Sequence, residues 1–254
     1  MFFGPIVTNM GSRVSFTDTL ARWDKQNFTS VKVITGWGLS GGWSSNDRAQ
    51  ILSLTPNPIV RTVAGDPSSR RHPLPHPGII IDELRPWLDM KFNLMVELGN
   101  EPNIKPVEDR FIWEYRYFLD QSIDLVRRMY PHAHIIAPAF IVNNTTQRWF
   151  DVCKDVLEKC DSVGIHAYEH VSFLSAKDIP RTNQLATLNN MYEGIKKPKV
   201  MTEYGINDPK VSKVVKLSEY RQMLPILKTM GYIGAAFYHV NVKEDIDPQY
   251  HIPV

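Results

Sequence analysis

Two glutamates stand in polar clusters that directly follow apolar runs of the sequence. Glu101 comes after Asn100 and before a proline in ELGNEPN at 97–103, and Glu203 stands in KVMTEYG at 199–205. Two carboxyl groups that face each other push their titrations apart, so that one is protonated while the other is ionised. A carboxylic acid that donates a proton, beside a carboxylate that attacks carbon, meets the requirement for breaking a glycosidic bond.

Further polar and aromatic residues stand at or near the ends of the other apolar runs. A barrel built for stability alone would not need an arginine, an asparagine, histidines and several rings at these positions. The candidate substrate-binding residues are Asn100, His166, Tyr168, Arg61, Trp37 and Tyr238, and His239 stands beside them.

The elements that must position these residues alternate along the chain. Eight apolar runs are expected to be strands, at 3–9, 30–37, 58–65, 93–100, 134–140, 162–168, 199–205 and 232–240. Amphipathic segments between them are expected to be helices, at 17–28, 45–54, 79–91, 111–130, 145–160, 182–195 and 216–230. Strands rich in valine and isoleucine that alternate with helices form parallel sheets buried on both faces.

Eight such units in 254 residues predict an α/β protein. Its fold would be a closed (β/α)8 TIM barrel, a single domain over residues 1–254, with an open doubly wound sheet as the alternative. The tail DIDPQYHIPV at 245–254 is a poor helix, so the last helix is expected to be stunted or missing. Strands four and seven of a barrel face each other across its mouth, which would bring Glu101 and Glu203 to one substrate bond.

Three short motifs resemble the clan A glycoside hydrolases, a group of retaining (β/α)8 enzymes that includes cellulases, mannanases and xylosidases. The motifs are GNEPN at 99–103, HAY at 166–168 and TEYG at 202–205. The resemblance implies that Glu101 is the acid/base and Glu203 the nucleophile. It also implies that Asn100 bonds the sugar 2-hydroxyl, that Tyr168 holds the nucleophile, and that His166 matches a histidine near that tyrosine.

The sequence departs from this pattern at two places. Clan members commonly carry a tryptophan at the end of strand eight, where this chain has AFYH, so Phe237 or Tyr238 would have to replace that sugar platform. The arginine at the rim of the clan's barrels often lies on strand two, whereas Arg61 is counted to strand three.

Several of these residue types also have structural interpretations. Glu97 stands an even number of positions before Glu101 on the same expected strand, so its side chain should also point into the barrel. A buried carboxylate there needs a partner such as Arg61 or a lysine. Tyr204 is expected to pack against a helix. In the Gly-rich stretch TGWGLSGGW, Trp37 is expected to contact substrate, while Trp43 could serve either role. The remaining tryptophans are expected to pack on helices: Trp23, Trp87, Trp113 and Trp149.

Composition narrows the classes of partner and cofactor. A net charge of +2 argues against a nucleic acid. No stretch is long and apolar enough for a membrane span. The start MFFGPIVTNMG lacks a basic region and a cleavage site, so a cytoplasmic location is the default expectation. Cys153 and Cys160 are too far apart on one helix for a disulfide and are expected to be free, buried thiols.

Metal and other cofactors are not expected. The histidine pairs 72/76 and 166/170 have helical spacing, but they do not lie on convincing helices and no further ligands complete a site. We therefore expect a monomeric retaining glycoside hydrolase without a cofactor, which acts on a β-linked poly- or oligosaccharide, with internal cleavage favoured by mostly short loops. The alternatives are a transglycosylase that uses the same site and a catalytically inactive barrel that binds glycans.

Overall fold

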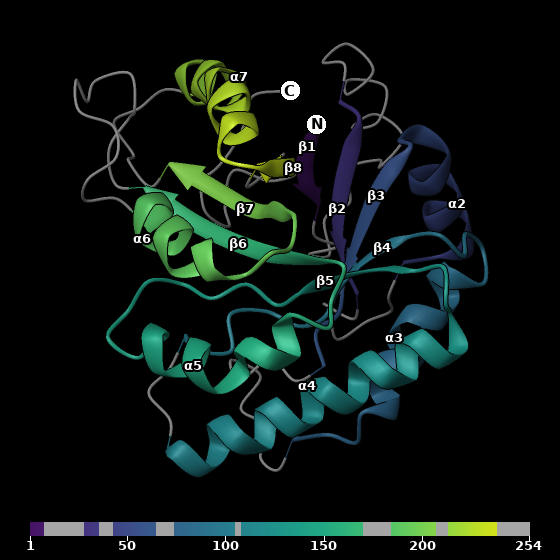
Figure 1. Cartoon of the computed structure of the whole chain (residues 1–254). Helices are drawn as coiled ribbons and strands as arrows, with labels where there is room; N and C mark the ends of the chain where they lie inside the picture. The colour runs from purple at the N-terminus through teal and green to yellow at the C-terminus, as the bar shows by residue number, and fades with distance from the viewer. Residues whose placement is uncertain are drawn as a thin grey trace.

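Eight parallel strands close into a barrel in chain order, and β8 pairs with β1 (Figure 1). The computed structural model describes residues 1–7, 28–35, 43–64, 74–104, 108–169, 184–206 and 213–237. The strands are β1 Phe2–Val7, β2 Ser30–Ile34, β3 Asn57–Arg61, β4 Met95–Glu97, β5 His134–Ala137, β6 Ser162–Glu169, β7 Lys199–Ile206 and β8 Tyr232–Phe237. The expected (β/α)8 barrel is confirmed, and the open sheet is excluded because β1 and β8 are joined.

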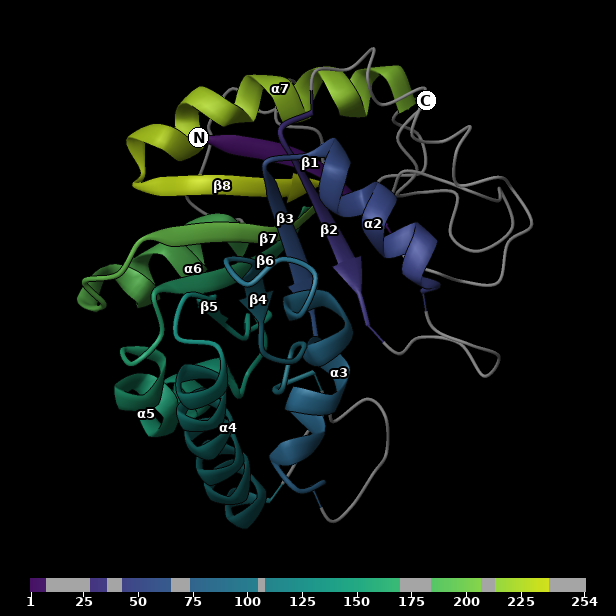
Figure 2. The same ribbon diagram turned by 90° about the vertical axis from the view of Figure 1, so that its right-hand side faces the viewer.

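Helices surround the barrel, with α7 on one side and α3, α4 and α5 on the other (Figure 2). Their bounds are α2 Ser45–Leu54, α3 Gly78–Leu88, α4 Asp109–Met129, α5 Thr146–Leu157, α6 Gln184–Met191 followed by a 3-10 turn η4 Tyr192–Gly194, and α7 Lys213–Thr229. Six of the seven expected helices are therefore confirmed, and both α3 and α7 continue through a proline. The helix expected at 17–28 lies almost wholly outside the described residues, as does the chain after β8. No helix in the described segments is long and apolar enough to cross a membrane.

The barrel interior is apolar at one level and charged at the next. Ile59, Ile136 and Val200 form a small buried cluster inside the barrel, which we call the barrel floor. Side chains two residues apart on a strand point the same way, so Arg61 follows Ile59 into the interior on β3. Glu97 follows the half-buried Met95 in the same way on β4. The alternation of the strands thus places charged groups directly above an apolar floor.

A bulge in β7 turns Glu203 toward the interior. Met201 and Tyr204 both lie in the outer core between strands and helices. In a regular strand, residues three positions apart would point to opposite faces. The pairing with β6 shifts by one residue here, so that Met201 pairs with Ile165 and Glu203 with His166. An extra residue of this kind re-aims the side chains that follow it. Tyr204 stacks edge-on against Tyr220 of α7, as the expected packing role requires.

The tryptophans divide between core and surface. Trp43 is 7% exposed and meets Trp87 edge-on at 6.1 Å between ring centroids, so its role is core packing. Trp149 is fully buried, as expected. The prediction for Trp113 is wrong, because this side chain is 58% exposed. It lies off the apolar stripe of α4, whose buried positions run from Phe111 to Val126 at helical spacing. Trp23 lies outside the described residues.

The two cysteines are buried and form no disulfide, as expected. Burial raises the pKa of the Cys153 and Cys160 thiols to about 12. Both thiols therefore stay protonated at neutral pH, which suits a packing role and not a nucleophilic one.

Candidate active site

The GNEPN segment forms a tight loop after β4 with two residues in the left-handed region. Gly99 has a φ of 90°, which glycine adopts without strain, and Glu101 has a φ of 30°. A non-glycine residue held there costs about 1–3 kcal/mol and needs support from its surroundings. Thr62 Oγ1 accepts a hydrogen bond from Gly99 N at 2.8 Å, and Ile104 N donates to Glu101 O at 2.9 Å. The loop therefore fixes the direction of the Glu101 side chain.

Asn103, the last residue of the motif, ties this loop to the one after β5. Its Nδ2 donates to Ile141 O at 2.7 Å, and its Oδ1 accepts from Ile141 N at 3.0 Å. Asn143 Nδ2 donates in turn to Asn103 O. Asn103 is fully buried, so each of these bonds replaces lost hydration. Sequence reasoning did not assign Asn103 a role, although its place two residues after Glu101 was a usable signal.

Glu203 is held by donors from three other strands. Its Oε1 accepts from Lys32 Nζ at 2.9 Å and from Arg61 Nη1, and its Oε2 accepts from Tyr168 Oη. Burial alone would raise the pKa of Glu203. The positive charges of His166, Lys32 and Arg61 and the hydrogen bond from Tyr168 outweigh burial and hold that pKa well below its usual range. Glu203 is thus an ionised carboxylate at neutral pH.

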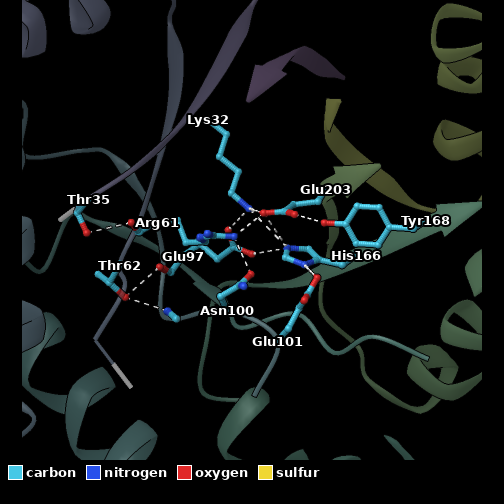
Figure 3. A network of polar contacts seen from close by, with 11 residues as sticks. Lys32, Thr35, Arg61, Thr62, Glu97, Asn100, Glu101, His166, Tyr168 and Glu203 are labelled. Atoms are coloured by element: carbon cyan, nitrogen blue, oxygen red, sulfur yellow. Dashed lines mark hydrogen bonds and ion pairs between the residues drawn. The ribbon is translucent and has the colours of Figure 1, made fainter. Parts of the chain in front are cut away.

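Glu101 has a different environment from Glu203. Its Oε1 lies 2.8 Å from His166 Nδ1. One carboxylate oxygen of Glu101, one of Glu203 and one ring nitrogen of His166 all lie within 4.8 Å of one another (Figure 3). Three such groups can also hold a metal ion, but a cation here would be repelled by Lys32 and Arg61, which already supply positive charge to Glu203.

His166 is fully buried between the carboxylates. Burial alone would lower its pKa, but the charge of Glu203 and the hydrogen bonds to Glu101 and Glu97 raise the pKa of His166 overall, against an opposing contribution from Lys32. The ring therefore holds a proton more readily than a histidine in water does.

Lys32 and Glu97 form a fully buried ion pair beneath the two glutamates. Lys32 Nζ lies 2.6 Å from Glu97 Oε2, and neither side chain is exposed. The expectation that Glu97 has a buried ion-pair partner is confirmed, with the lysine as that partner. Burial would raise the pKa of Glu97, but Lys32 and the hydrogen bond from His166 lower it to about 2. Lys32 was missed, although a lysine inside the valine-rich run SVKVI is itself unusual for a buried strand.

Comparisons with known proteins bear on the fold that carries this arrangement. Neither a known protein family nor a curated protein matches the sequence. Among solved structures, an endo-1,4-beta-D-mannanase from Thermotoga petrophila matches with a TM-score of 0.61 and 14% identity, over 99% of this chain and 92% of that one. This chain shares the fold of the clan A glycoside hydrolases.

Two further structures support that statement. A family 39 glycoside hydrolase from Bacteroides cellulosilyticus matches with a TM-score of 0.68 and 16% identity over 98% of this chain. The chain spans 59% of the length of that protein. A β-mannanase from Thermomonospora fusca matches with a TM-score of 0.61 and 13% identity, over 94% of this chain and 78% of that one.

Within this (β/α)8 fold, most of the expected site residues come together. Arg61 ends β3, as counted, and its Nη1 also donates to Asn100 Oδ1 at 2.6 Å. Strand two supplies Lys32 to Glu203. Phe237 is 1% exposed and stacks on Tyr220 at 4.7 Å, so it belongs to the outer core and does not provide a sugar platform. Trp37, Tyr238 and His239 lie outside the described residues, as do His72 and His170.

Proposed function

We propose that this protein is a retaining glycoside hydrolase that cleaves a β-linked poly- or oligosaccharide in two steps, with Glu203 as nucleophile and Glu101 as acid/base. The observation that carries the proposal is the approach of their carboxylate oxygens to within 4.8 Å. Retaining enzymes place the two carboxyl groups about 5–5.5 Å apart, whereas inverting enzymes leave about 6.5–9.5 Å for a water molecule.

The first step needs an ionised nucleophile and a protonated acid. Lys32, Arg61 and Tyr168 all donate to Glu203, so its carboxylate is formed and oriented before substrate arrives. A Glu203 oxygen attacks the anomeric carbon while Glu101 gives its proton to the departing glycosidic oxygen. The electron pair of the broken C–O bond leaves with that oxygen, and the sugar becomes an ester of Glu203.

The second step returns both groups to their starting states. Glu101, now a carboxylate, takes a proton from a water molecule that attacks the same anomeric carbon. The ester bond breaks, its electron pair returns to Glu203, and the sugar departs with its original β configuration. The donors around Glu203 favour this step too, because they stabilise the carboxylate as a leaving group.

Asn100 and Arg61 would bind the sugar next to these carboxylates. Asn100 Oδ1 accepts from Arg61, so the Nδ2 end of the amide is the one that can donate to a hydroxyl such as the sugar 2-hydroxyl. Trp37 and Tyr238 are proposed to supply flat apolar surfaces for sugar rings. We propose internal cleavage, in keeping with the mostly short loops of the sequence.

A panel of β-linked polysaccharides, assayed by the release of reducing ends, tests the proposal. We expect one class of β-glucan, β-mannan or β-xylan to be cut, with a fast fall in viscosity and with products whose first-formed anomer is β by NMR. First-formed α products would contradict the two-step mechanism. Binding to a glycan without turnover of that glycan or of any aryl glycoside would identify a glycan-binding barrel instead.

A further inference from the structure

The proposed reaction gives two buried ionisable residues, Glu97 and His166, no direct task. Together with Lys32 they lie beside Glu101 and Glu203 (Figure 3), and all three side chains are 0% exposed. Buried charges are costly unless they are paired, and a barrel interior is more easily filled with apolar side chains. Their arrangement around the ring of His166 gives them a common purpose.

The two ring nitrogens of His166 face two different glutamates. Nε2 lies 3.3 Å from Glu97 Oε1, and Nδ1 lies 2.8 Å from Glu101 Oε1. A carboxylate only accepts hydrogen bonds, and Glu97 is ionised beside Lys32, so the contact with Glu97 favours a hydrogen on Nε2. Lys32 Nζ, 3.5 Å from Nε2, is a donor only and favours the opposite tautomer with a bare Nε2, but Glu97 Oε1 lies closer to Nε2 than the lysine does.

This constraint on Nε2 decides what Nδ1 can do. When the ring is neutral, Nδ1 bears a lone pair, and Glu101 must be protonated to hydrogen-bond with it. When the ring is charged, Nδ1 carries the hydrogen and Glu101 must be a carboxylate. In both cases one proton lies between His166 Nδ1 and Glu101 Oε1.

We propose that Glu97 is a positioning residue, which fixes the Nε2–H tautomer of His166 so that His166 and Glu101 share the proton that Glu101 donates to the leaving group. The inference rests on the proposed hydrolase function, which gives that proton its use. Glu97 itself touches neither substrate nor the reacting atoms and acts through His166.

The charges around His166 balance only with this shared proton. Lys32 on β2 and Arg61 on β3 contribute two positive charges, while Glu97, Glu101 and Glu203 contribute three negative ones. One more positive charge makes the buried cluster neutral. The ring of Tyr168 from β6 also faces His166, at 6.3 Å between centroids, and its hydroxyl keeps its hydrogen because it donates to Glu203.

The neighbouring strand leaves room for the Glu97 carboxylate. A Cβ on Gly164 of β6 would lie 3.2 Å from Glu97 Oε1 and 3.1 Å from Thr202 Oγ1. The absence of a side chain at Gly164 therefore lets Glu97 reach Nε2 of His166. Residue types from β2, β4 and β6 thus agree on one position for this carboxylate.

Nitrogen NMR on protein labelled with 15N in histidine tests the tautomer directly. A His166→Gln variant identifies the His166 signals by their loss. In the wild type at neutral pH we expect Nε2 to carry a hydrogen throughout and Nδ1 to show the shared proton. A wild-type ring with the hydrogen on Nδ1 and a bare Nε2 would overturn the inference.

The pH dependence of kcat/KM in Glu97→Gln gives the second readout. The change removes one negative charge beside the shared proton, so the site holds that proton less tightly. The alkaline limb should therefore move to lower pH by about one unit, which is a tenfold fall in the affinity of the site for the proton. Glu97→Asp keeps the charge and should return the alkaline limb most of the way to its wild-type position. Glu219→Gln, which removes a buried carboxylate in α7, is the matched control and should leave the limb in place. An unmoved limb in folded Glu97→Gln would overturn the inference.

The two readouts separate this inference from the proposed function. Turnover by a wild type whose His166 carries a hydrogen on Nδ1 and none on Nε2 refutes the role of Glu97 and leaves the hydrolase intact. A wild type that turns over no glycoside refutes the hydrolase, and with it the use of the shared proton. If Glu97→Gln does not fold, the wild-type tautomer decides the inference.

Discussion

Replacing Tyr168 with phenylalanine removes one of the three donors that the described residues offer to Glu203 and leaves the rest of the site in place. Tyr168 Oη is the donor to Oε2, while Lys32 and Arg61 both donate to Oε1. A hydrogen bond to a charged group contributes about 1.5–3 kcal/mol. At 1.36 kcal/mol for each factor of ten, the loss corresponds to a fall in kcat/KM of about 10- to 150-fold.

The variant should also change the pH dependence of the reaction. Without the bond from Tyr168, the pKa of Glu203 rises, so the acidic limb of the kcat/KM profile should move to higher pH. Initial rates on an aryl glycoside across pH measure both effects. Tyr204→Phe is the matched control, because it removes a hydroxyl on the opposite face of β7, in the outer core. Wild-type kcat/KM and an unmoved acidic limb in folded Tyr168→Phe would refute the assignment of Tyr168 to the nucleophile.

Two further predictions concern stability. In Gly164→Ala the new Cβ would lie 2.6 Å from the backbone oxygen of Ala137, so we expect β5 and β6 to separate slightly. This should lower the free energy of unfolding by about 1–3 kcal/mol and Tm by about 2–4 °C per kcal/mol. An unchanged Tm by circular dichroism would contradict this. Urea unfolding should show that stability falls as the pH drops from 4.5, the ordinary pKa of a glutamate, toward about 2, the pKa of Glu97. The reason is that Glu97 and Glu203, whose pKa values are both lowered, stabilise the fold only while they are ionised. The raised pKa of His166 acts in the opposite sense, so stability should also decline as the pH rises above its ordinary value of 6.5, and a flat profile would contradict both.

The barrel could be predicted from the sequence because its signal is repeated. Each unit joins a short apolar run to an amphipathic segment, and an error in one boundary does not change the count. β4 shows such an error: the run at 93–100 was expected to be strand throughout, but the strand is Met95–Glu97. Gly99 and Glu101 take positive φ values, which end the regular strand before the motif begins.

The partners of the predicted residues were harder to derive. Glu101 and Glu203 carry their own local motifs, whereas the position of Lys32 beside Glu203 depends on the closure of the barrel from β2 to β7. The inward direction of Glu203 depends on a bulge that alternation along β7 does not reveal. Trp113 was misplaced because residue type was weighed without its angle on the helix. Contacts between distant strands follow from the closed topology, which a local pattern cannot specify.

The assignment of separate roles to Glu101 and Glu203 is the central claim, and azide tests it most directly. Azide is a nucleophile that needs no general base. With a dinitrophenyl glycoside, Glu101→Ala should still form the glycosyl-enzyme, because this leaving group needs no proton, and azide should then restore turnover and give a β-glycosyl azide. Glu203→Ala has a vacated face from which azide can attack, so it should give the inverted α-glycosyl azide. NMR assignment of the two product anomers distinguishes the roles. An α-glycosyl azide from Glu101→Ala and a β-glycosyl azide from Glu203→Ala would mean that the two roles are exchanged. Full activity of both variants without azide would contradict the hydrolase assignment itself.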